Sequence, residues 1–273
     1  MRVSTGDRFG RAIILVALAL FGVVPLLSLF TTALSKQGSL PQGLAWPSDP
    51  QWQNFSEAWT AANFLTLLQS SILIVVGVVP ITLAMATLAG YALAQFRVPG
   101  GKVIYTLFLL GLTLPFESLI TPLYYDIKSL NLLGSQLAVI IPEIALLLPF
   151  GVFWMRSQFQ AVEPALTEAA TVDGASRWQV FTRIHLPLAT PSWSALAILY
   201  FLATWNQYLL PLVLIDDPSK RTMAGGLGAF QGQYGDNIQL LCAGSLIIIA
   251  PSLLVFLVFQ RSFVRALLAG AVK

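Results

Sequence analysis

Six long apolar stretches divide the chain, and shorter polar stretches separate them. Each apolar stretch is close to the roughly 20 helical residues that cross the hydrocarbon core of a bilayer. The predicted spans are residues 12–34, 67–93, 103–120, 136–155, 193–215 and 240–259. The pattern therefore predicts an all-α polytopic membrane protein, with a single transmembrane domain over residues 12–273 after an N-terminal segment of residues 1–11.

A proline lies in or near every predicted span. Proline removes an intrahelical hydrogen bond and permits a kink, which membrane helices tolerate where neighbours satisfy the freed backbone groups. We therefore expect kinked spans. The first apolar run exceeds the roughly 7–15 residues of a signal-peptide core, so we expect an uncleaved membrane anchor.

Composition and charge placement agree with this class. Hydrophobic residues make up 56% of the chain and charged residues only 10%, whereas globular proteins carry about 25% charged residues. If the N-terminus is cytoplasmic, eleven of the fifteen Lys and Arg residues lie in cytoplasmic segments, which is the usual bias. We therefore expect a multi-pass protein of the cell membrane with both termini, the polar segment 157–191 and the tail 260–273 in the cytoplasm. Nothing in the charge indicates nucleic-acid binding.

The polar segment has the signals of two short helices. Pro164 suits the first turn of a helix, and Gly174 suits the left-handed position just past a helix end. Ser176, followed three residues later by Gln179, has the spacing of a capping box, which predicts a second helix. Pro187 is expected to end that helix. The predicted arrangement is a helix, a glycine hinge and a second helix outside the bilayer.

The same segment carries a pattern of fixed spacing, Glu168-Ala169-Ala170, then Gly174, Ile184 and Leu186-Pro187. It resembles the EAA loop of ABC importer permeases, and the alternative is an interfacial loop of an unrelated membrane protein. The resemblance implies the type I ABC importer permease fold, with a coupling helix that docks in a groove of a cytoplasmic ATPase subunit. The coupling residues that it implies are Glu168, Ala169, Ala170, Asp173, Gly174, Ile184, Leu186 and Pro187. Glu168 would offer its carboxylate to an arginine of the ATPase.

Two further runs resemble carbohydrate-importer permeases. Residues 205–211, Trp-Asn-Gln-Tyr-Leu-Leu-Pro, resemble a signature of the fifth span, and residues 114–117, Leu-Pro-Phe-Glu, resemble a third-span segment near the cavity. The substrate-pathway candidates are Glu117, Trp205, Asn206, Gln207 and Tyr208. Amide groups match solute hydroxyls, and aromatic rings stack on sugar faces. The alternatives are an interfacial aromatic belt for Trp205 and a hydrated or paired carboxylate for Glu117.

Two acids, Glu117 and Glu143, lie within the predicted spans. An ionisable group inside a membrane is costly and marks a functional hypothesis. A secondary carrier that couples transport to ions through these carboxylates is therefore the alternative function. The inverted repeat common in such carriers is not evident in the sequence.

The C-terminal run of residues 265–273 resembles the ending of the same permeases. Ala266 stands where the family has Gly, and Leu268 stands where it has Thr, but Gly270 and Lys273 are kept. The resemblance implies that this tail also contacts the ATPase.

No metal, cofactor or catalytic role is expected on this chain. Cys242 and His185 are the single residues of their types, which excludes a Cys/His metal cluster, and His185 is expected at a surface or interface. Residues 100–102, Gly-Gly-Lys, lack the spacing and the Ser/Thr of a P-loop. ATP and Mg²⁺ are therefore expected on partner ATPase subunits.

Together, these features predict the permease subunit of a binding-protein-dependent ABC importer of the maltose-type carbohydrate family. The expected partners are a second homologous permease subunit, two copies of a cytoplasmic ATPase subunit and an extracytoplasmic solute-binding protein. The expected solute is a sugar or a related polyhydroxy compound.

Overall fold

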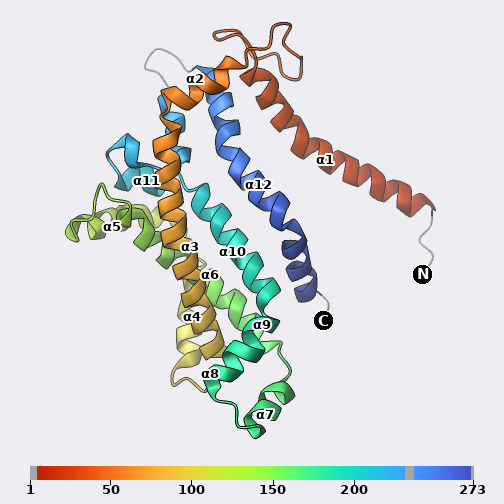
Figure 1. The fold of residues 1–273 in the computed structure, drawn as a ribbon, viewed down its shortest axis with the longest axis vertical. Coiled ribbons are helices and arrows are strands. Elements are labelled where there is room, and N and C mark those ends of the chain that lie inside the picture. The colour runs from red at the N-terminus through yellow and green to blue at the C-terminus, as the bar shows by residue number, and fades with distance from the viewer. Residues whose placement is uncertain (1–4, 231–236, 272–273) are drawn as a thin grey trace. The chain divides into compact units, whose positions relative to one another are not determined.

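The computed structural model describes the backbone of residues 5–230 and 237–271 and the side chains of residues 9–230 and 237–260. Within these ranges every regular element is helical, as predicted (Figure 1). The α-helices are α1 (Thr5–Ala33), α2 (Gln53–Ala61), α3 (Phe64–Gln95), α4 (Gly101–Gly111), α5 (Phe116–Ser129), α6 (Leu137–Gln160), α7 (Pro164–Val172), α8 (Arg177–Val180), α9 (Leu186–Leu188), α10 (Thr190–Trp205), α11 (Leu209–Leu214) and α12 (Ile238–Ala271). A π-helical turn, η1, covers Phe181–His185, and 3₁₀ turns cover Pro218–Lys220 (η2) and Met223–Phe230 (η3).

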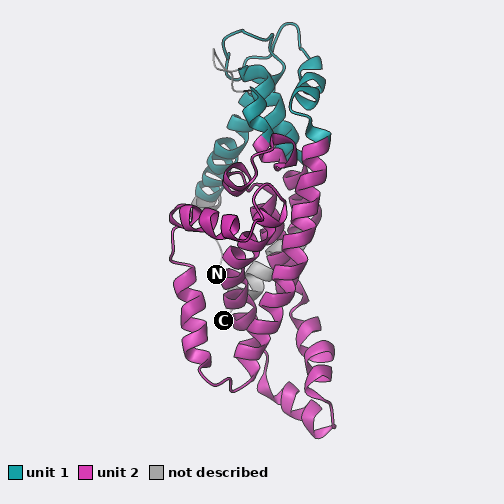
Figure 2. Cartoon of the chain, turned by 90° about the vertical axis from the view of Figure 1, so that its left-hand side faces the viewer, with its two compact units in different colours: residues 1–65, 226–250 teal, residues 66–225, 251–273 magenta. Residues whose placement is uncertain are grey.

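The chain forms two compact units (Figure 2). Unit 1 contains residues 1–65 and 226–250, and unit 2 contains residues 66–225 and 251–273. The sequence pattern predicts a single transmembrane domain over the same region. Unit 2 contains every element between α4 and α11, and therefore both candidate functional regions.

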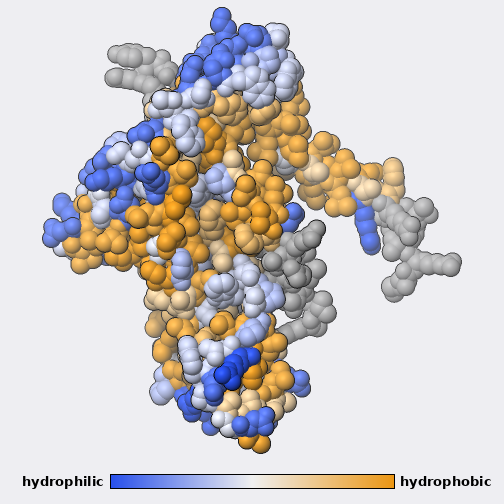
Figure 3. All heavy atoms as spheres, in the orientation of Figure 1, coloured by the Kyte–Doolittle hydropathy of each residue, from blue (hydrophilic) through white to orange (hydrophobic). Residues whose placement is uncertain are grey.

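Four helices are each long and apolar enough to cross a membrane. They are Phe9–Ala33 within α1, Phe64–Gln95, Leu137–Gln160 and Ile238–Gln260 within α12, and they overlap four of the six predicted spans. None of the apolar window of α1 is buried within the chain, and Figure 3 shows hydrophobic residues along this helix. Two bent helix pairs meet the same criterion jointly, which gives up to six spans in the described residues.

The third predicted span, residues 103–120, is not a single kinked helix. It consists of α4 and the start of α5, which meet at 103° across a short break. Pro115, at the N-cap of α5, is extended, with φ −67° and ψ 125°. A proline also pushes the residue before it out of the helical region, so the break is sharper than the predicted kink.

The fifth predicted span, residues 193–215, is also interrupted. Helix α10 ends at Trp205, and α11 begins at Leu209. Pro211, in the first turn of α11, has no N–H to continue the hydrogen-bond ladder of α10. The side chain of Gln207 instead accepts hydrogen bonds from the backbone N–H groups of Leu209 (3.1 Å) and Leu210 (3.4 Å), and these bonds cap the new helix.

The prediction that Pro187 ends the second helix of the polar segment is confirmed to within one residue, because the helical run ends at Leu188. The chain continues from α8 through η1 into α9 and then bends by 72° into α10. Pro187 lies in α9 and has no N–H with which to continue the hydrogen-bond ladder from η1. The bend follows α9, at Ala189.

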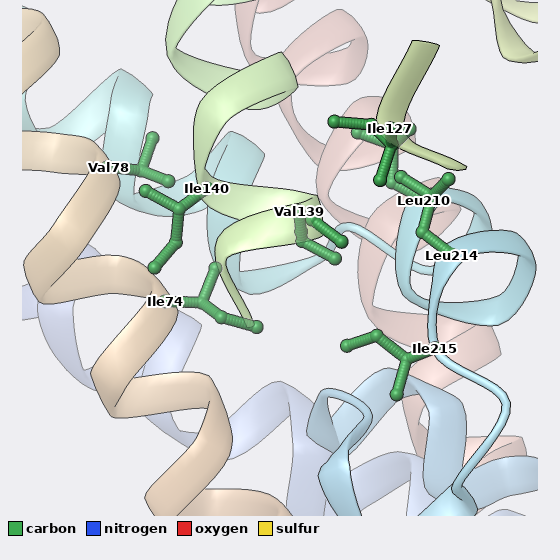
Figure 4. Close-up of a cluster of buried hydrophobic side chains, with 9 residues drawn as sticks. Ile74, Val78, Ile127, Val139, Ile140, Leu210, Leu214 and Ile215 are labelled. Atoms are coloured by element: carbon green, nitrogen blue, oxygen red, sulfur yellow. The ribbon is translucent and has the colours of Figure 1, made fainter. Parts of the chain in front are cut away.

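Two buried clusters hold unit 2 together. The first joins α3, α5, α6 and α11, and Figure 4 shows Ile74 and Val78 beside Ile140, with Ile127 facing Leu210. The second joins α3, α6, η1 and α10 through the residues Leu83, Ala86, Tyr91, Met155, Phe159, Phe181, Ala189, Leu196 and Tyr200. The first cluster holds α5 and α11 against α6. The second holds η1 and α9, which form the base of the polar segment, against α3, α6 and α10.

Candidate functional site

The local geometry of the polar segment is confirmed. Pro164 occupies the first turn of α7, and Gly174 has φ +80°, a conformation that side chains disfavour. Ser176 caps α8: its backbone N–H donates to Gln179 Oε1 at 2.7 Å, and the N–H of Gln179 donates to Ser176 Oγ at 3.3 Å. Each half of the segment therefore folds from its own short-range signals.

The segment presents an exposed surface at one end of unit 2, where Figure 1 shows α7 and α8. Glu168 and Ala169 are exposed on α7. Large apolar side chains are exposed beside them, with Val172 88% and Trp178 64% accessible. Exposed apolar groups among polar ones are typical of an interaction surface.

The eight coupling candidates do not all share this surface. Glu168, Ala169, Asp173, Gly174 and Pro187 are exposed, whereas Ala170, Ile184 and Leu186 are partly buried. Leu186 packs against the second buried cluster. The pattern therefore divides into an exposed group, mostly on α7 and its hinge, and a partly buried group, mostly at η1 and α9.

The predicted surface or interface position of His185 is wrong, because its side chain is completely buried. A hydrogen bond of 3.0 Å joins His185 Nε2 to Thr167 Oγ1 on α7. The imidazole also lies edge-on to Tyr91 and to Phe159, with ring centroids 5.1 and 6.0 Å apart. His185 therefore connects α7 to helices α3 and α6, and no sequence signal marks it for this contact.

Replacing Thr167 by valine tests this connection, because the change keeps the shape and removes the hydroxyl. One hydrogen bond contributes about 1 kcal/mol, so amide hydrogen exchange in α7 is expected to rise about fivefold. The matched control is Thr171→Val, whose hydroxyl bonds only to a carbonyl of its own helix, that of Thr167, at 2.8 Å. Equal exchange rates in the two variants would show that α7 does not depend on His185.

The five substrate-pathway candidates are not brought together. Glu117 is exposed in the first turn of α5. Trp205 is 3% exposed and stacks on Phe201 at 5.6 Å, which does not fit an interfacial belt. Asn206 is exposed, and its Nδ2 donates to the carbonyl of Leu202 at 2.7 Å.

Only Gln207 of the five lines a cavity of about 290 Å³, between the α4–α5 break, α6 and the end of α10. Tyr208, beside it in the chain, is 39% exposed and is not part of the lining. The second polar residue of the cavity is Glu143, which is 2% exposed. Its Oε2 has no hydrogen-bond partner, and such a buried group costs roughly 1–3 kcal/mol. The sequence identified Glu143 as an acid in a span, but only the fold places it in this cavity.

The remaining candidates concern metals and the C-terminal tail. In the described part of the chain, no three residues of the types His, Cys, Asp and Glu are grouped to hold a metal ion. Gly270 lies in α12, which continues as a helix to Ala271 through most of the predicted tail. Lys273 lies outside the described residues.

Comparison with known proteins supports the sequence resemblance. Residues 86–268 match the family described as "Binding-protein-dependent transport system inner membrane component". The chain is 31% identical over 276 residues to the diacetylchitobiose uptake system permease protein NgcG of Streptomyces coelicolor, covering 99% of this chain and 91% of that protein. It is 34% identical over 261 residues to the arabinooligosaccharides transport system permease protein AraQ of Halalkalibacterium halodurans, covering 94% of this chain and 93% of that protein.

A solved structure shares the fold. A chain of a bacterial ABC transporter involved in the import of the acidic polysaccharide alginate superposes with a TM-score of 0.79 at 22% identity, covering 96% of this chain and 99% of that chain. The family match spans both the polar segment and the helices around the cavity. The chain therefore belongs to the family of binding-protein-dependent transport system inner membrane components.

Proposed function

We propose that this chain is the permease subunit of an ATP-driven importer for a carbohydrate or related polyhydroxy solute. It pairs with a second homologous permease subunit, two copies of a cytoplasmic ATPase subunit bind the pair, and an extracytoplasmic protein delivers the solute. The chain itself performs no catalysis and holds no cofactor, and ATP and Mg²⁺ bind to the ATPase subunits. Relatives named for diacetylchitobiose and arabinooligosaccharide uptake support the solute class.

The observation that carries this proposal is the exposed α7–α8 surface. It combines an exposed acid, Glu168, with accessible apolar side chains at Val172 and Trp178. Such a surface fits a groove on a protein partner, where apolar groups give affinity and charges give orientation. Glu168, Ala169, Asp173 and Gly174 are the residues that we assign to direct contact with the ATPase.

The partly buried residues transmit the movement of α7. Ile184 and Leu186 lie where η1 and α9 lead into α10, next to the exposed Pro187, and Ala170 is partly buried on α7. When the ATPase subunits bind ATP and close, they would move α7. This movement would pass through η1 and α9 to α10. The gated pathway would then shift between inward- and outward-facing states because ATP binding favours one of them.

The orientation of the chain follows from the charge bias. With the N-terminus cytoplasmic, eleven of the fifteen Lys and Arg residues fall in cytoplasmic segments, including the polar segment, which is the usual bias. We propose that this side, with both termini, is cytoplasmic, and that Gly270 and Lys273 extend the ATPase contact. Glu117, Trp205, Asn206 and Tyr208 border the solute pathway under this proposal.

A mild-detergent purification of the tagged full-length chain tests the proposed function. We expect a second permease and an ATPase with a P-loop to co-purify, and ATP hydrolysis to rise several-fold when the binding protein is loaded with its solute. The control is the same complex with unloaded binding protein. A chain that purifies alone and takes up solute when an ion gradient is the only driving force would instead identify the ion-coupled carrier.

The carrier alternative has weaker structural support. It needs two carboxylates that act together, but Glu117 is exposed on α5 and does not line the cavity that contains Glu143. A single buried acid is a poor basis for a relay.

A further inference from the structure

The cavity beside α6 contains hydrogen-bonding groups that the protein does not satisfy. Glu143 Oε2 is buried without a partner. The hydroxyl of Thr204, on α10, lies near the same carboxyl group, and Thr204 Oγ1 is also buried without a hydrogen-bond partner. A carboxylate offers about four acceptor positions, so a rotation of this hydroxyl toward Glu143 would still leave most of them open.

Gln207 supplies the complementary donors. Its Oε1 already accepts from the N–H groups of Leu209 and Leu210. This capping directs the two N–H bonds of Nε2 elsewhere, and no described residue accepts them. The cavity therefore has an acceptor on one wall and a donor on another, and apolar side chains such as Phe116, Leu146 and Leu147 line the rest.

Two helix interruptions border this cavity. Leu112 and Leu114 come from the break between α4 and α5, and Gln207 comes from the break between α10 and α11. At membrane depth, non-helical backbone is tolerated where it is buried in protein or lines a cavity. Discontinuous helices of this kind form the solute sites of many transporters. The breaks and the orphaned polar atoms are independent observations that point to one place.

We propose that Glu143 and Gln207 form a hydrogen-bonding site for one hydroxyl-bearing ring of a neutral solute, a proposal that rests on the proposed carbohydrate import. The carboxyl group of Glu143 bonds to ring hydroxyls, and the amide nitrogen of Gln207 donates to a hydroxyl oxygen. The apolar walls pack against the ring. With about 290 Å³, the cavity is at the lower end of small-molecule pockets, which suits one ring rather than a whole oligosaccharide.

The charge of the lining selects among carbohydrates. No basic side chain is among the described residues that line the cavity, so a sugar acid or sugar phosphate would find no countercharge there. Glu143 would repel it. The site therefore fits neutral solutes such as diacetylchitobiose or an arabino-oligosaccharide, which serve as the first probes.

The test uses the complete transporter in proteoliposomes, with ATP and the loaded binding protein. Glu143→Leu is expected to lower uptake at least tenfold, while ATP hydrolysis stimulated by the binding protein stays within twofold of wild type. The thermal midpoint of the complex should stay equal or rise, because the change removes an unsatisfied buried group. Glu143→Gln, which can still donate and accept, should keep at least a third of the uptake.

Gln207→Glu gives a second, independent variant. It keeps an oxygen to cap α11 and removes the N–H donors, so uptake should again fall at least tenfold. The matched control is Asp126→Leu, an exposed acid on α5 outside this cavity, whose uptake should stay within twofold of wild type.

Each of the other possible results of these experiments would contradict one part of the proposal. Wild-type uptake by Glu143→Leu and Gln207→Glu would mean that the cavity holds only water, and this would overturn the solute site. A lower thermal midpoint with parallel loss of uptake and hydrolysis in both Glu143 variants would make Glu143 structural. A wild-type complex that moves only anionic solutes would overturn the neutral class, and one that moves no carbohydrate with ATP would overturn the proposed function itself.

Discussion

Replacing Glu168 by lysine is expected to reduce ATP-driven uptake at least tenfold while leaving the helices of this chain folded. Glu168 is exposed on α7, and no described residue forms a salt bridge or hydrogen bond with its carboxylate. The substitution therefore removes nothing inside the chain. At the proposed interface it would place two positive charges together, and such like-charge contacts cost several kcal/mol, more than the 1.4 kcal/mol that corresponds to tenfold.

Uptake and ATP hydrolysis by the purified complex in proteoliposomes measure this effect. The matched control is Glu163→Lys, an exposed acid at the N-cap of the same helix. Its charge reversal costs only about 0.3–1 kcal/mol through the helix dipole, so uptake should stay near that of wild type. Full uptake by Glu168→Lys in an intact complex would show that α7 does not engage the ATPase through this carboxylate.

The polar segment was predictable because its signals are local. Pro164, Gly174 and the Ser176–Gln179 pair each act on backbone groups within four residues. A helix start, a left-handed hinge and a capping box therefore need no knowledge of the rest of the fold. The exposed position of Glu168 follows from the same short helix.

The position of His185 was not predictable, because it depends on contacts distant in sequence. Its imidazole is buried only because α3 brings Tyr91 and α6 brings Phe159 to the base of the segment. A single histidine in a polar stretch is compatible with either a surface or a core position. Phe181 and His185, at the two ends of the π-helical turn, are both buried.

The environments of the two acids in the predicted spans were also not predictable from the sequence. Glu117 and Glu143 are both acids in apolar stretches, so the hydropathy pattern does not distinguish a buried position from an exposed one. Their environments separate only once α4 and α5 part at Pro115, which leaves Glu117 exposed and Glu143 against the cavity. Proline signals a kink, but the bend of 103° depends on how α5 packs on α11 through Ile127 and Leu210.

A close approach of α3, α6 and α10 in unit 2 depends on Gly151 of α6. A Cβ atom added there would lie 2.6 Å from the Cβ of Ala86 on α3 and would collide with the hydroxyl of Tyr200 on α10. That hydroxyl donates to the carbonyl of Leu147 at 3.2 Å, so it is not free to move aside. Small residues at such crossings let membrane helices pack through their backbones.

Gly151→Ala is therefore expected to destabilise the complex by about 3 kcal/mol, at the upper end of the usual cost of overpacking. This corresponds to a fall of roughly 6–12 °C in the thermal midpoint, measured by the unfolding of the detergent-purified complex. Gly22→Ala is the control, because a Cβ atom there meets nothing within 4 Å. The double variant Gly151→Ala with Tyr200→Phe should recover about half of the loss, since it removes the hydroxyl and leaves the contacts with Ala86 and with the ring carbon Cζ of residue 200 at 2.9 Å. An unchanged midpoint in Gly151→Ala would mean that α3, α6 and α10 pack less closely than the structure shows, and the cavity between α6 and α10 would then lack its rigid wall.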